Sequence, residues 1–214
     1  MSKDSLFSKK RMTLLRDPLN DSNPITVQAL GVCSALAITV QLKPAIVMAI
    51  SVMVVLSVAN VLISLMRKLI PSRIRIIVQL VVIAALVILV DEVLKAFVYD
   101  VSKELSVFVG LIITNCIIMG RLEAFGMANG PWVSSLDGIG NSFGYAWILI
   151  VVAFFRELLG SGTLYGYPVL EKIGLYETGY ENNGMMILPP MALITVGIII
   201  WIQRMKNEKL IESK

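Results

Sequence analysis

The sequence contains no histidine and only two cysteines, Cys33 and Cys116, in 214 residues. Without histidine, the chain has no imidazole to bind a metal, complete a catalytic triad or shuttle protons. Two cysteines provide neither a disulfide framework nor a CxxC redox motif. No stretch has the pattern of a phosphate-binding loop after a strand. These absences exclude triad hydrolases, histidine metal sites and P-loop enzymes.

Charged residues are also scarce, at 16% of the chain, whereas 57% of the residues are hydrophobic and the mean hydropathy is +0.80. A soluble domain carries roughly a quarter charged residues. The composition therefore indicates one integral membrane domain, with no room for a soluble catalytic domain. The net charge of +4 comes from basic residues beside apolar segments, which favours membrane topology over nucleic-acid binding. Residues 1–23 are polar and basic, so we expect no cleavable signal peptide.

Six apolar windows predict an all-α membrane fold with six transmembrane helices. The windows cover residues 24–40, 44–66, 74–97, 105–120, 139–159 and 185–203. We predict a cytoplasmic N-terminal segment over 1–23, a membrane domain over 24–203 and a cytoplasmic tail over 204–214. Asn23 is the expected N-cap of the first helix and Pro24 its first residue. Since a span usually needs ~20 residues, the first and fourth windows are short.

The distribution of lysine and arginine predicts the orientation of these helices. If the N-terminus is cytoplasmic and six helices alternate, the cytoplasmic segments carry fourteen of the nineteen basic residues and the opposite side carries five. The positive-inside rule then places both termini in the cytoplasm. An odd number of helices would remove this asymmetry.

The two short windows are also the two that carry cysteine. Cys33 lies nine residues after Pro24, and Cys116 lies eleven residues after Leu105. At ~1.5 Å per helical residue, both are roughly 14–17 Å deep, near the middle of a ~30 Å hydrocarbon core. Short segments at matching places in two halves suggest a 3+3 inverted repeat, in which interrupted helices meet at the midplane to build a site.

The cysteines allow three interpretations. They can be small buried residues, as free cysteine often is, or a disulfide, or ligands of a metal. Two thiolates cannot complete an iron–sulfur site of four protein ligands, so they would form half a site that a homologous partner completes. Gly31 permits a close backbone approach beside Cys33, and Asn115 precedes Cys116.

Charged residues near the predicted helix ends have a simpler interpretation than function. Interfacial anchoring or interhelical ion pairing explains them best. These residues are Asp91, Glu92, Lys95, Arg156 and Glu157.

Three further features are not specific enough to name a function. Asn60 and Gln79 lie deeper, where they could line an ion path or form interhelical hydrogen bonds. Gly138–Gly144 follows an expected loop, residues 131–137, and its spacing does not fit a nucleotide-binding fingerprint. Gly160–Gly184, rich in glycine and tyrosine, is expected to be an outer loop.

Several stretches carry a resemblance to a known family. They are Asn23-Pro24, Leu30–Ala37 (Leu-Gly-Val-Cys-Ser-Ala-Leu-Ala), Ile74–Gln79 (Ile-Arg-Ile-Ile-Val-Gln), Leu105–Phe125 with its Thr-Asn-Cys-Ile-Ile-Met-Gly-Arg core, and Phe154–Gly162 (Phe-Phe-Arg-Glu-Leu-Leu-Gly-Ser-Gly). The chain from residue 23 to 201 resembles the D-subunit family of the bacterial Na+-translocating NADH:quinone reductase. Homologous subunits occur in the related Rnf complex, but the Ser-Val-Phe-Val-Gly and Phe-Phe-Arg-Glu stretches resemble the quinone reductase version.

The resemblance implies six helices in an inverted repeat and a homologous partner, the E subunit, of opposite topology. It implies that Cys33 and Cys116 bind one [2Fe–2S] cluster at the membrane midplane, with the partner supplying the other two ligands. The chain would relay electrons across the bacterial inner membrane during sodium-exporting quinone reduction, beside the A, B, C, E and F subunits. It would have no NADH or quinone site of its own. An ion-path or purely scaffolding role is the alternative.

Overall fold

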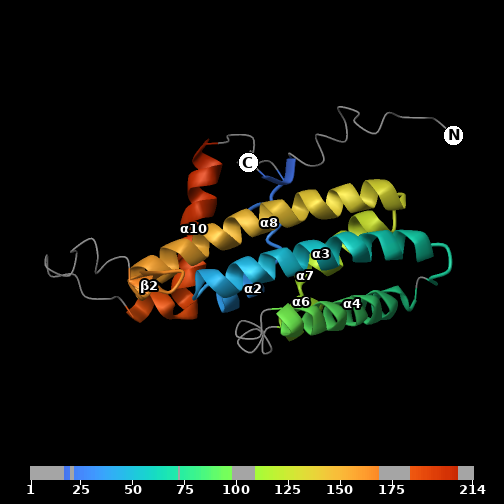
Figure 1. The fold of residues 1–214 in the computed structure, drawn as a ribbon. Helices are drawn as coiled ribbons and strands as arrows, with labels where there is room; N and C mark the ends of the chain where they lie inside the picture. Colours follow the sequence, from blue (N-terminus) through green and yellow to red (C-terminus); the bar gives the residue numbers. More distant parts are fainter. Residues whose placement is uncertain (1–16, 20–21, 72, 98–108, 169–183, 207–214) are drawn as a thin grey trace, which may run out of the picture.

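The computed structural model describes residues 17–19, 22–71, 73–97, 109–168 and 184–206, and these are mostly helical (Figure 1). Three helices are long and apolar enough to cross a membrane: α3 (Leu42–Met66), α4 (Arg75–Phe97) and α8 (Pro131–Gly160). The order of elements confirms the predicted all-α membrane class. The six-helix inverted repeat stays a prediction at this point.

Helices α3 and α8 form the centre of the molecule and run side by side in opposite directions (Figure 1). Their contact is lined by small and branched apolar side chains, among them Val52, Leu56, Leu149 and Val152, which are fully buried. By contrast, α4 leaves much of its apolar surface exposed. In a bilayer such a surface contacts lipid or a partner without the cost it would have in water.

Helix α8 begins at Pro131, eight residues earlier than the sequence predicted. The expected loop at residues 131–137 is wrong, because this stretch forms the first turns of the helix. Pro131 occupies the first helical position, directly after Gly130 in an extended conformation, and proline is well suited to that position. The resulting helix of 30 residues is ~45 Å long at 1.5 Å per residue.

The first apolar window is mostly not helical. Residues 24–31 form turns, and the helical part of this window is α2 (Val32–Ile38). Asn23 does accept hydrogen bonds from the backbone N–H groups of Ile25 (3.0 Å) and Thr26 (3.2 Å), but it caps a turn and not a helix. The prediction of a helix starting at Pro24 is therefore wrong, whereas the depth of Cys33 in the membrane stays a prediction.

The fourth window is broken as well. It consists of α6 (Val109–Ile113), a break at Thr114 and Asn115, and α7 (Cys116–Arg121), which continues into a π-helical turn, η1 (Leu122–Gly126). Residues 105–108 of this window lie outside the described part of the chain. Helix α6 packs on α4, whereas α7 and η1 contact α3.

The remaining elements lie at the end of α8. A short hairpin, β1 (Thr163–Leu164) paired with β2 (Tyr167–Pro168), follows that helix directly. After the 3-10 turn η3 (Gly184–Ile187) comes α10 (Pro189–Lys206), which contacts α2 and α8 and stands across the end of α8 in Figure 1. The expected outer loop at 160–184 is described only at its two ends.

Candidate functional site

Cys33 is the second residue of α2, immediately after a sharp backbone break. Ala29 and Gly31 both have positive φ angles, 54° and 83°, so the chain passes through left-handed conformations just before the helix. Glycine adopts this region without the steric penalty of other residues. The Ser34 hydroxyl donates to the Gly31 carbonyl at 2.8 Å and fixes the turn. The Cys33 side chain is exposed on the surface of the chain.

Cys116 has an equivalent position in the second half of the chain. It is the first residue of α7, directly after the break that ends α6. Asn115 is extended and caps α7, its side-chain oxygen accepting from the Ile117 N–H at 3.3 Å. The Cys116 side chain is exposed too. Each cysteine therefore begins a short helix that follows an interruption.

The two breaks lie against each other. A Cβ atom added to Gly31 would be 3.6 Å from the side-chain oxygen of Asn115, and one added to Gly120 would be 3.1 Å from Leu30 Cδ1. Both breaks also contact α8 through Tyr145, whose hydroxyl donates to Ser34 at 2.7 Å. The fold thus brings together two cysteine-bearing segments that are about eighty residues apart in sequence.

The side chains of Cys33 and Cys116 are the only thiols that the chain has. Both are free, so the disulfide interpretation does not hold in this structure. Their exposure also contradicts the interpretation as small buried residues. Within the described residues, no group of three or more His, Cys, Asp or Glu side chains could hold a metal ion. The donor set fits two of the four thiolates of an iron–sulfur site and leaves the rest to another chain.

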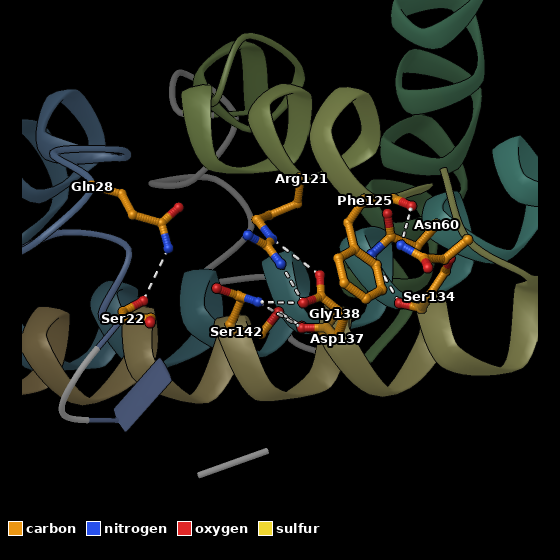
Figure 2. Close-up of polar contacts among 11 residues, drawn as sticks. Ser22, Gln28, Asn60, Arg121, Phe125, Ser134, Asp137, Gly138 and Ser142 are labelled. Carbon is orange, nitrogen blue, oxygen red and sulfur yellow. Dashed lines mark hydrogen bonds and ion pairs between the residues drawn. The ribbon is translucent and has the colours of Figure 1, made fainter. Parts of the chain in front are cut away.

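A polar cluster that the sequence did not predict links α7 to the first turns of α8. Figure 2 shows Arg121 of α7 extending to Asp137 of α8. Its Nε donates to Asp137 Oδ2 at 3.0 Å, and its Nη2 forms an ion pair with Asp137 Oδ1. The Asn141 side chain also donates to Asp137, at 3.1 Å to Oδ1. Asp137 is almost fully buried, so the pair is shielded from water on that side.

Asn60 and Gln79 both form hydrogen bonds between elements. Asn60 of α3 donates to the Ser134 carbonyl of α8 at 3.0 Å (Figure 2), and Gln79 of α4 donates to Glu123 of η1 at 3.1 Å. Both side chains are fully buried, and in each the amide oxygen has no hydrogen-bond partner among the described residues. Of the two interpretations that the sequence left open, interhelical hydrogen bonding is present, and the ion path stays a prediction.

The charged residues at the end of α8 are buried and do not anchor the helix at an interface. Arg156 is 1% exposed and donates to Thr39 Oγ1 at 2.6 Å and to the Leu36 carbonyl at 3.3 Å, both near the C-terminus of α2. It also donates to backbone carbonyls of residues 186–188. Glu157 accepts from the Leu42 N–H, where α3 begins. Among the described residues, hydrogen bonds between elements thus take the place of both predicted roles, interfacial anchoring and interhelical ion pairing.

At the end of α4, the anchoring interpretation is compatible with the structure. Lys95 forms ion pairs with Asp91 at 2.7 Å and with Glu92 at 3.0 Å, all within one helix. Exposed pairs of this kind contribute little to stability.

Sequence reasoning missed Tyr145, Arg121 and Asp137 as members of the site and its surroundings. The sequence did offer one signal for two of them. Tyr145 and Asp137 place a hydroxyl and a carboxylate on the same apolar helix, where polar groups usually have partners. Their partners lie on segments distant in sequence and could not be assigned without the fold.

Comparison with known proteins adds a family context to this geometry. Residues 11–200 match a family model described as "Rnf-Nqr subunit, membrane protein". A protein of Photobacterium profundum is 53% identical over 208 residues, which cover 97% of this chain and 98% of the relative. A protein of Haemophilus ducreyi is 53% identical over 201 residues, covering 94% and 96%. A protein of Shewanella sp. (strain W3-18-1) is 51% identical over 208 residues, covering 97% and 98%. All three relatives are named as the D subunit of the Na(+)-translocating NADH-quinone reductase.

Proposed function

The chain belongs to the Rnf-Nqr family of membrane subunits, and on this basis we propose that it relays electrons across the bilayer through a [2Fe–2S] cluster shared with a homologous partner. The complex is a Na+-translocating NADH:quinone reductase, the name that its close relatives carry. One observation carries the proposal. Cys33 and Cys116 are both exposed, and the two interrupted segments that carry them lie against each other.

The number and exposure of the thiols support a shared site. A [2Fe–2S] cluster takes four protein ligands, and this chain offers two thiolates and no histidine. Because both side chains are exposed, a second chain can bring its own ligands to the same place. The role of Cys33 and Cys116 is to bind the iron, and the buried Ile117 and Ile118 exclude water behind Cys116. When bound, the cluster supplies one-electron transfer.

The order of elements supports a 3+3 inverted repeat. In the first half, a broken segment ending in α2 is followed by α3 and α4. In the second half, a broken segment made of α6 and α7 is followed by α8 and α10. The excess of basic residues on one side supports a cytoplasmic location of both termini. The bacterial relatives support the inner membrane as the location of the helices.

The partners follow from the same assignment. The E subunit, a homologue of opposite topology, supplies the other two thiolates, and the A, B, C and F subunits complete the enzyme. This chain contributes no NADH or quinone site of its own. Its exposed apolar surface on α4 contacts lipid and neighbouring subunits.

Iron analysis of the intact complex tests this function. Wild type is compared with Cys33→Ala and Cys116→Ala, and Ser51→Ala provides a matched control because its buried hydroxyl bonds only within α3. Each cysteine variant should lose about two iron atoms per assembled complex, together with one [2Fe–2S] electron-resonance signal. NADH oxidation by artificial acceptors should remain while quinone reduction stops. Full iron content and turnover in both cysteine variants would refute the relay.

A second role is suggested by the unpartnered amide oxygens of Asn60 and Gln79. Neutral oxygens of this kind suit a hard cation such as Na+, so an ion path on this chain is the alternative. Asn60→Leu or Gln79→Leu should then reduce sodium flux while NADH-driven quinone reduction continues. Equal losses of both activities would argue against a separate ion path.

A further inference from the structure

Tyr145 is the residue of α8 that lies directly behind both interrupted helices. Its side chain is fully buried. Its hydroxyl donates to Ser34 Oγ at 2.7 Å, and the edge of its ring would be 3.0 Å from a Cβ atom on Gly31. The Asn115 side chain lies beside the same hydroxyl. The side chain of Tyr145 thus contacts both cysteine-bearing segments.

The residues that Tyr145 contacts are immediate neighbours of the two thiols. Ser34 follows Cys33, and Asn115 precedes Cys116. Ser34 in turn donates to the Gly31 carbonyl at 2.8 Å, so the hydrogen-bonded chain runs from the phenol into the first break. A displacement of this hydroxyl would therefore change the backbone on both sides of the site.

Asn115 adds a buried amide group between this hydroxyl and Cys116. Its side chain is 4% exposed, and its oxygen accepts from the Ile117 N–H. Its amide nitrogen, Nδ2, has no hydrogen-bond partner among the described residues. A buried unpaired amide costs stability unless an acceptor satisfies it. The Tyr145 hydroxyl oxygen lies beside this side chain, and the adjacent Cys116 would bring thiolate or cluster sulfur as a further acceptor.

We propose that Tyr145 is a positioning residue for the two-cysteine site: its hydroxyl fixes the segments before Cys116 and after Cys33, and so holds the Asn115 amide as a hydrogen-bond donor to the sulfur of the bound group. This inference rests on the proposed function. Hydrogen bonds to cluster sulfur and the arrangement of outer-shell residues set the reduction potential of such centres. A donor favours the reduced, more negative form.

The test uses the intact complex with Tyr145→Phe, which removes the hydroxyl and keeps the ring against Gly31. Ser34→Ala breaks the same link from its other end. Tyr165→Phe is the matched control, since Tyr165 is 51% exposed in the hairpin turn. We expect the Tyr145 and Ser34 variants to retain iron, to show altered electron-resonance g values, and to have a lower midpoint potential than wild type. The control should match wild type in all three.

The outcomes separate this inference from the proposed function. If Cys33→Ala and Cys116→Ala both keep full iron content and turnover, the relay itself is wrong. If the cysteine variants lose iron but Tyr145→Phe and Ser34→Ala keep wild-type g values and potential, only the positioning role is wrong. If Tyr145→Phe does not assemble, the Ser34→Ala spectrum decides, because that change leaves the phenol packed in place.

Discussion

Replacing Gly31 by alanine is the most direct perturbation of the break before Cys33. The φ angle of +83° costs an L-residue roughly 1–2 kcal/mol. The new methyl group would also lie 3.0 Å from Cε2 of Tyr145, whose fully buried ring would have to shift. Overpacking of this kind typically costs ~1–3 kcal/mol. Because the ring can shift by a few tenths of an ångström, we expect a total loss of about 2–4 kcal/mol.

The measurement is the apparent melting temperature of the detergent-solubilised complex, followed by heating and size-exclusion chromatography. A loss of this size lowers Tm by roughly 5–15 °C for a chain of this length. Gly110→Ala is the control, since Gly110 lies in α6 with open space at its Cβ. Gly31→Asn should recover only the backbone part of the loss, because asparagine tolerates the left-handed region but still meets Tyr145. The reasoning fails if Gly31→Ala melts together with Gly110→Ala.

Three further substitutions test the buried polar contacts by the same melting measurement. Arg156→Met removes five hydrogen bonds. If only two of them contribute the ~1.5–3 kcal/mol of a charged donor, the chain should lose at least about 3 kcal/mol; a wild-type Tm would contradict this. Asp137→Asn should lower the free energy of unfolding by about 3 kcal/mol, because it leaves the Arg121 guanidinium without its carboxylate partner. Adding Arg121→Met to this variant should restore most of the lost stability, because it removes the unpaired charge. Asn60→Leu should cost only ~1 kcal/mol, the usual contribution of an interhelical hydrogen bond in membranes, and a loss as large as that of Arg156→Met would indicate a further role.

The sequence predicted the two uninterrupted helices α3 and α4 well. The windows at 44–66 and 74–97 correspond to α3 and α4 within two residues. Long apolar runs leave the backbone no alternative to internal hydrogen bonding in a bilayer, so length and hydropathy suffice to find them.

The interrupted and mixed segments were harder to predict. Residues 24–31 are as apolar as a helix, but a side-chain hydrogen bond from Asn23 to the Gly144 carbonyl, at 3.0 Å, helps to hold them as turns. The start of α8 was missed because its first turns mix apolar residues with Ser134 and Asp137, although Gly130 and Pro131 did mark the helix start.

For the candidate site, the sequence could identify the cysteines by their residue type, but it could not show which residues contact them in the fold. Cys33 and Cys116 could be selected because cysteine is rare in this chain and falls in the two short windows. Tyr145 could not, because its place beside both breaks depends on how α8 packs on α2 and α7. The same holds for the partner that completes the site.

The hydrogen bond between Asn23 and Gly144 also has a consequence for biosynthesis. It joins residues 121 positions apart, one just before the first break and the other in the middle of α8. At ~5–20 residues per second, a ribosome needs roughly 6–24 s to make the chain between them. The segment that leaves the ribosome first therefore waits for α8 before its turn can form. During that interval the insertion machinery or a chaperone has to keep residues 24–31 away from water, because this apolar stretch is too irregular to span the bilayer alone.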